Sequence, residues 1–126
     1  MLDYIYKCKQ DCIYFKSAVP DAYPPNIVAR AMSSTSIQLQ WRPLLPPAPT
    51  NGLIIGYEVK YAEKSAVPKI WMSYNIPGVG NRLPTISDLR KYTKYDFKVA
   101  AKTSKGSGVF SPVVEMETFE DSKNPK

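Results

Sequence analysis

The sequence has 126 residues, 44% of them hydrophobic and 22% charged, which predicts one packed domain and excludes wholesale disorder. Twelve Pro and nine Tyr, against six Gly, favour short strands joined by stiff turns over helices. The net charge of +6 is scattered, without a run of five basic residues, and predicts either a solvated basic surface or attraction to an anionic partner.

The N-terminal residues 1–12 alternate apolar and charged side chains and lack the apolar core of a signal peptide. No stretch approaches about 18 consecutive apolar residues, so we expect that this sequence alone neither spans a membrane nor directs its own secretion. Cys8 and Cys12 precede the predicted domain and would stand about 13 Å apart in an extended chain, too far for a disulfide unless the chain bends. As a pair they are also too few for a structural zinc site.

Strand signals begin after the Pro24-Pro25 entry, where the hydrophobic period becomes two. Ile27 and Ala29 are expected to face the core from the first strand. The next strand ends at a Pro-rich loop, residues 43–49. Its predicted inward residues are Ile37, Leu39 and Trp41.

Asn51-Gly52 is a turn dipeptide that tolerates positive φ, and it is expected to start a strand at residues 53–62. A less regular strand near residues 70–76 and a short one at 82–86 are expected next. In the strand expected at residues 53–62, the predicted inward residues are Ile55, Tyr57, Val59 and Tyr61.

Alternation resumes at Tyr95, and residues 104–108 indicate a turn before the last strand. The inward residues of these two strands are expected to be Tyr95, Phe97, Val99 and Ala101, then Val114, Met116 and Thr118. Short strands separated by frequent turn signals, without a sustained helical period, predict an all-β antiparallel sandwich of seven strands.

Several segments also occur together in a particular order and spacing. They are Pro24-Pro25, residues 36–41, residues 51–61, Leu89 six residues before Tyr95, residues 95–99 and Gly106-Ser107-Gly108. Together they resemble the fibronectin type III family over roughly residues 24–119. The resemblance implies an immunoglobulin-like sandwich in which Tyr95 is a tyrosine corner, its hydroxyl bonded to the backbone near residues 89–91. The implied structural core comprises Trp41, Tyr57, Val59, Tyr61, Leu89, Tyr95, Phe97 and Val99.

The resemblance also suggests a division of the chain. We expect the domain at residues 20–119 and a C-terminal linker at 120–126. Residues 1–19 are either an N-terminal leader or the remnant of a preceding repeat. Both flanks resemble the linkers between consecutive repeats, so the module is expected to be one repeat of a larger receptor or adhesion protein.

No motif supports catalysis, because the chain has no His and no Ser in a Gly-x-Ser-x-Gly elbow. Gly106-Ser107-Gly108 joins two predicted strands and lacks the Gly-Lys-Ser/Thr of a phosphate loop. Acidic residues do not follow the spacing of a calcium loop. We therefore predict no enzymatic activity, no cofactor and no metal site.

Two surfaces are candidates for binding. The first is a basic stripe of Lys60, Lys94, Lys98 and Lys102, expected on the outer face of one sheet and diluted by Glu58 and Asp96. Such a stripe either meets an acidic protein or an anionic polysaccharide, or serves only solubility. Nucleic acid is not expected, because the stripe lacks interleaved exposed aromatic residues.

The second candidate is the end of the sandwich where the loops at residues 42–50 and 104–110 should emerge together. Its candidate contacts are Leu44, Leu45, Lys105 and Phe110. The apolar side chains among them either form a contact surface or pack back on the core.

These features lead to one preferred function and several alternatives. We expect a non-enzymatic, extracellular or cell-surface module that contacts protein partners, or a spacer repeat of a tandem array. The alternatives are a glycosaminoglycan-binding module acting through the basic stripe and an intracellular scaffold repeat.

Overall fold

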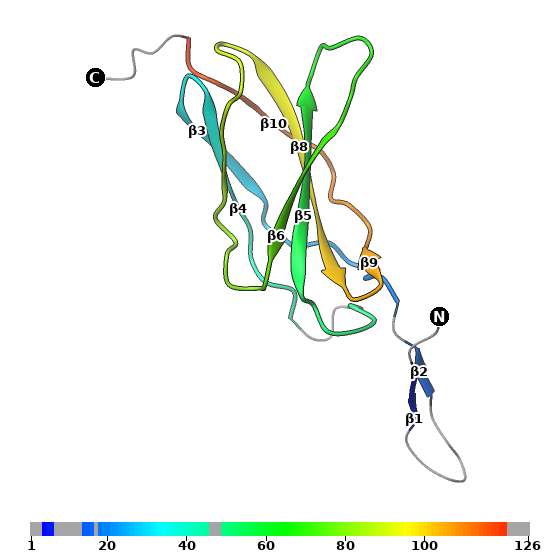
Figure 1. The fold of residues 1–126 in the computed structure, drawn as a ribbon. Coiled ribbons are helices and arrows are strands. Elements are labelled where there is room, and N and C mark those ends of the chain that lie inside the picture. The colour runs from blue at the N-terminus through cyan, green and yellow to red at the C-terminus, as the bar shows by residue number, and fades with distance from the viewer. Residues whose placement is uncertain (1–3, 7–13, 17, 46–48, 121–126) are drawn as a thin grey trace.

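The computed structural model describes residues 4–6, 14–16, 18–45 and 49–120. Within these ranges it contains ten strands and no helix, and therefore no helix long and apolar enough to cross a membrane. Two antiparallel sheets form a β-sandwich, which confirms the predicted fold class (Figure 1). A separate hairpin precedes the sandwich, with β1 (Tyr4–Tyr6) paired to β2 (Tyr14–Lys16). Cys8 and Cys12 lie outside the described residues.

The smaller sheet has the strand order β3-β4-β7, with β3 at Val28–Ser33, β4 at Ser36–Gln40 and β7 at Thr85–Ile86. Hydrogen bonds extend its last pairing beyond β7, because the Leu39 and Trp41 N–H groups donate to the carbonyls of Pro84 and Arg82. The expected short strand at residues 82–86 is therefore present as a hydrogen-bonded segment along β4.

The larger sheet has the order β10-β8-β5-β6, with β9 also paired to β8. Its strands are β5 (Gly56–Glu63), β6 (Met72–Pro77), β8 (Lys94–Thr103), β9 (Gly106–Ser107) and β10 (Val114–Glu117). β5 and β8 pair along the whole of β5, from Gly56 opposite Lys102 to Glu63 opposite Tyr95. Gly56 permits the close approach of β6, because a Cβ there would lie 2.5 Å from the Ile76 carbonyl oxygen.

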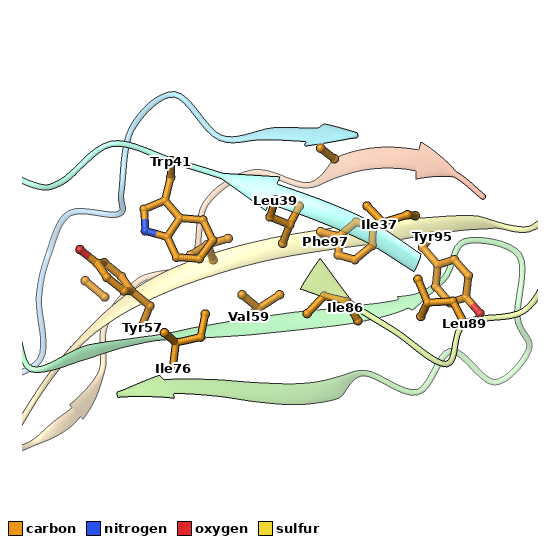
Figure 2. Close-up of a cluster of buried hydrophobic side chains, with 13 residues drawn as sticks. Ile37, Leu39, Trp41, Tyr57, Val59, Ile76, Ile86, Leu89, Tyr95 and Phe97 are labelled. Carbon is orange, nitrogen blue, oxygen red and sulfur yellow. The ribbon is translucent and has the colours of Figure 1, made fainter. Parts of the chain in front are cut away.

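The core lies between the inner faces of the two sheets (Figure 2). The Trp41 side chain is 3% exposed, and its ring meets the Tyr57 ring edge to face with centroids 5.1 Å apart. Tyr61 is half-buried and stacks on Phe97 at 6.1 Å. The fully or largely buried hydrophobic residues of this cluster include Ile37, Leu39, Val59, Ile76, Ile86, Leu89, Tyr95, Phe97 and Val99.

The tyrosine corner is formed as the resemblance implied. The Arg90 N–H donates to the Tyr95 hydroxyl oxygen at 2.8 Å, and Leu89 is buried beside it. Burial raises the pKa of Tyr95 above its ordinary value, although the Arg90 hydrogen bond acts in the opposite direction. This phenol is therefore an architectural group that stays protonated at neutral pH.

One strand prediction was wrong at its start. β5 begins at Gly56, whereas the turn dipeptide Asn51-Gly52 led us to expect a start at Leu53. Leu53 is 81% exposed and Ile55 is 46% exposed, so neither is an inward residue of the core. Ile54 packs against the core cluster instead, and Ile55 stays bonded to the sheet through the Lys102 carbonyl and the Gly78 N–H.

Candidate protein-binding surface

Lys60 and Lys98 stand directly opposite each other on β5 and β8. The Lys98 Nζ atom lies 4.4 Å from the centroid of the Trp71 ring and 5.4 Å from that of Phe110, and the Lys60 Nζ atom lies 5.2 Å from the Phe110 centroid. An ammonium at these distances is attracted by the ring quadrupole. We call these four residues the lysine–aromatic cluster. The two rings are half-buried, so they are not the exposed aromatic residues whose absence the sequence predicted, but their contacts with the lysines were not expected.

A second cation extends the cluster toward Asp96. Lys69 Nζ lies 4.9 Å from the Trp71 centroid and forms an ion pair with the Asp96 carboxylate. Asp96 is only 4% exposed, so it does not dilute the stripe on the surface as predicted. It points outward from β8, but the segment carrying Lys69 and Trp71 covers it. Burying a carboxylate is tolerable here because an ammonium neutralises it directly.

Glu58 is the other carboxylate on this face, and it is held by hydroxyl groups. The Ser73 and Ser107 hydroxyls both donate to its carboxylate, which ties β6 and β9 to β5. Desolvation by burial would raise the pKa of Glu58, but these hydrogen bonds and the charges of Lys60 and Lys102 outweigh it, so the pKa lies below its ordinary value.

The four lysines of the predicted stripe therefore differ in their partners. Lys102 donates to the Asn75 side-chain oxygen at 3.0 Å, and Lys94 lies 3.9 Å from Glu115. Lys60 and Lys98, in contrast, form no ion pair with any carboxylate of the described residues. Lys98 lies near two rings and Lys60 near one, and Lys60 also acts on Glu58 through its charge. Because neither lysine is ion-paired within the described part of the chain, both present positive charge on the outer face of the sheet.

The loop end brings together fewer of its predicted residues. Leu44 is partly buried against the core cluster, which is one of the two alternatives, whereas Leu45 is 66% exposed and stays a predicted contact. Phe110 belongs to the lysine–aromatic cluster and not to this surface. Lys105 is half-buried in the turn before β9.

Two apolar hollows flank Leu44, of about 360 Å³ and about 530 Å³. They share Pro43 and Leu44, and their exposed rims include Leu45, Leu53 and Val79. Their linings are mostly apolar, and the polar side chains among them are Tyr23, Asn26, Arg42, Thr50 and Tyr57. Within the described part of the chain there is no group of three His, Cys, Asp or Glu side chains able to hold a metal ion.

Sequence reasoning missed Trp71 and Lys69 as parts of the basic face. Trp71 lies just before β6, in a region where the expected strand was irregular. Trp71 and Phe110 are far apart in the sequence, and no local pattern links them. Both rings lie near Lys98 because β5 pairs with β6 and β8 in the folded sheet. The sequence did indicate Lys60 and Lys98, because both occupy outward positions in the alternating patterns of their strands.

Comparison with known proteins places this geometry in context. The family model described as "Fibronectin type III domain" matches residues 22–117. Protein sidekick-1 of Gallus gallus is 38% identical over 113 residues, which is 87% of this chain but 5% of that protein. Ephrin type-A receptor 8 of Homo sapiens is 40% identical over 84 residues, covering 67% of this chain and 8% of the receptor. The chain thus spans only a small part of the length of these relatives.

Solved structures give the same architecture. The third fibronectin III domain of a human protein superposes with a TM-score of 0.74 at 20% identity, covering 86% of this chain and 90% of that one. The FN5 domain of Drosophila Lar superposes with a TM-score of 0.64 at 26% identity, covering 82% of this chain and all of that domain (100%).

Proposed function

Since this chain belongs to the fibronectin type III family, we propose that it is one repeat of a cell-surface adhesion or receptor protein and that it binds a protein partner. The relatives support the proposal, because both the sidekick proteins and the ephrin receptor are far longer than this chain. An extracellular location follows from the same proposal. The fold alone does not specify a function, so the argument depends on the exposed surface.

The observation that carries the proposal is the lysine–aromatic cluster. Lys60 and Lys98 face each other across two strands, and no described carboxylate lies within ion-pairing distance of either. Trp71 and Phe110 restrict the ammonium groups, which lowers the entropy lost when a partner immobilises them. A rigid sheet with restrained cations and half-buried rings suits an acidic, partly apolar patch on another protein.

The partner is sought by screening the folded chain against a panel of cell-surface ectodomains, followed by charge reversal on the partner that binds. Lys60→Glu and Lys98→Glu should each weaken binding about 10- to 100-fold, because a like charge then faces the acidic patch. Arg30→Glu is the matched control, since Arg30 is an exposed cation on β3 of the other sheet and its reversal changes net charge equally. Urea unfolding of each variant checks that the fold is intact.

The screen also separates the alternatives. Equal losses from Arg30→Glu and Lys98→Glu would remove the cluster as the binding site. If the chain binds no ectodomain while a longer parent protein does, this repeat is a spacer. Retention on heparin that Lys98→Glu abolishes, without any protein partner, would assign the cluster to an anionic polysaccharide instead.

A further inference from the structure

Residues 18–21 precede the first strand of the sandwich, yet they are bonded to its loop end. The Ala18 N–H donates to the Asn51 carbonyl at 2.9 Å, and the Asp21 N–H donates to the Pro49 carbonyl at 2.9 Å. These bonds give the linker backbone the kind of pairing that a strand receives. The segment is therefore a folded part of the domain and not a loose tether.

The carbonyl groups of Ala18 and Val19 each accept a hydrogen bond from a side chain of the domain. The Thr103 hydroxyl donates to the Ala18 carbonyl at 2.7 Å, and Thr103 itself is 2% exposed. The Asn51 side-chain amide donates to the Val19 carbonyl at 3.1 Å and to the Asp21 carboxylate at 2.9 Å. Asn51 adopts a positive φ of 57°, which brings its amide toward the linker at low cost for this residue type.

Pro20 fills the space between the linker and the segment after β9. Its side chain is fully buried, and its carbonyl accepts the Val109 N–H at 3.2 Å. Gly108 is the residue that makes the space, because a Cβ there would meet the Pro20 carbonyl oxygen and lie 2.8 Å from both Pro20 Cβ and Cδ. Gly108 has no positive φ, so the absence of a side chain serves the contact with Pro20 and not the backbone conformation.

From these contacts we infer that the loop end of the domain is a seat for the chain's own linker, residues 18–21, which is held as a fixed part of the domain. The notch between residues 49–52 and 103–109 is occupied from within the chain, so a separate partner does not bind there. In the tandem array of the proposed function, which this step alone assumes, the joint to the preceding repeat is stiff rather than hinged.

The test replaces two glycines of the full chain by Ala, one packed against Pro20 and one in open space. Gly108→Ala pushes a methyl group into Pro20, whereas Gly80→Ala adds the same group where no atom lies within 4 Å. Amide hydrogen exchange is followed by NMR at Ala18, Asp21 and Val109, whose N–H groups hold the linker. We expect Gly108→Ala to lower their protection about tenfold or more, while Gly80→Ala leaves it unchanged.

Asn51→Gly provides a second variant in case Gly108→Ala does not fold. Gly accepts the positive φ, so this change removes the amide contacts to Val19 and Asp21 without backbone strain. It should raise the exchange rate at Asp21 and leave the core amides unchanged.

Unprotected amides at Ala18 and Asp21 in the unmodified chain, or backbone order parameters there below about 0.6, would overturn the inference. So would protection that neither Gly108→Ala nor Asn51→Gly alters. A failure to find a protein partner leaves these readouts untouched, so the proposed function and the linker seat are tested separately.

Discussion

Replacing Tyr95 by Phe removes one oxygen atom from the tyrosine corner and leaves the ring in place. The ring is buried and packs near Phe97 at 6.3 Å, so the apolar contacts remain. What is lost is the acceptor of the Arg90 N–H, at 2.8 Å in the structure. A buried donor without its partner costs about 1–3 kcal/mol, and the exposure of the Arg90 side chain allows water to reach the site. We therefore expect a loss of about 1–2 kcal/mol.

Urea unfolding measures this loss directly. With a denaturant slope of about 1.5 kcal/mol per M, the midpoint should fall by about 1 M at unchanged slope. Tyr92→Phe is the matched control, because Tyr92 is 63% exposed and lies close to the corner in sequence. If both variants shift the midpoint equally, or Tyr95→Phe does not shift it, the hydrogen bond does not stabilise the corner and the reasoning is refuted.

Two further predictions concern the outer face of the larger sheet. The pKa of Glu58 is depressed in the folded state, so its contribution to stability is present above the ordinary carboxyl pKa of about 4.5 and is lost as pH falls through the folded value. Glu58→Gln should therefore reduce the loss of stability at acid pH, measured by urea unfolding at a series of pH values. An unchanged acid dependence would contradict the assignment. Lys98→Ala should destabilise the domain by about 0.5–1 kcal/mol and shift the Trp71 fluorescence to longer wavelength, because the Lys98 ammonium lies over that ring. The control Lys94→Ala should leave the emission unchanged.

Strand periodicity identified much of the core, although not the exposure of Ile55, because alternation is a local property. Ile37, Leu39 and Trp41 alternate with polar side chains along a single strand. Their side chains therefore share one face, which is buried in any sandwich that turns that face toward the core. The tyrosine corner is local as well, since Tyr95 and Arg90 are five residues apart. Neither prediction required knowledge of which strands are neighbours.

The lysine–aromatic cluster depends on neighbours and was therefore missed in part. Trp71 and Phe110 meet Lys98 only because β6 and the segment after β9 flank β5 and β8 in the sheet. Asp96 was placed on the surface by alternation alone, which cannot show that Lys69 and its loop cover it. Side-chain direction was predicted correctly there, and burial was not.

The linker seat and the lysine–aromatic cluster share one short segment of chain. Gly108 and Val109 contact Pro20, and the next residue, Phe110, places its ring beside Lys60. This segment is tied to β8 at both ends, because the Gly108 N–H donates to the Ala101 carbonyl and the Ser111 N–H to the Val99 carbonyl, each at 2.9 Å.

The sheet, not the linker, therefore positions Phe110. It follows that Gly108→Ala should release the linker while leaving the cluster and its affinity for an acidic partner unchanged. A partner that binds the Gly108→Ala chain as tightly as the unmodified chain would thus separate the two functions of this domain: the loop end holds the chain's own preceding segment, and the outer sheet face remains available to another protein.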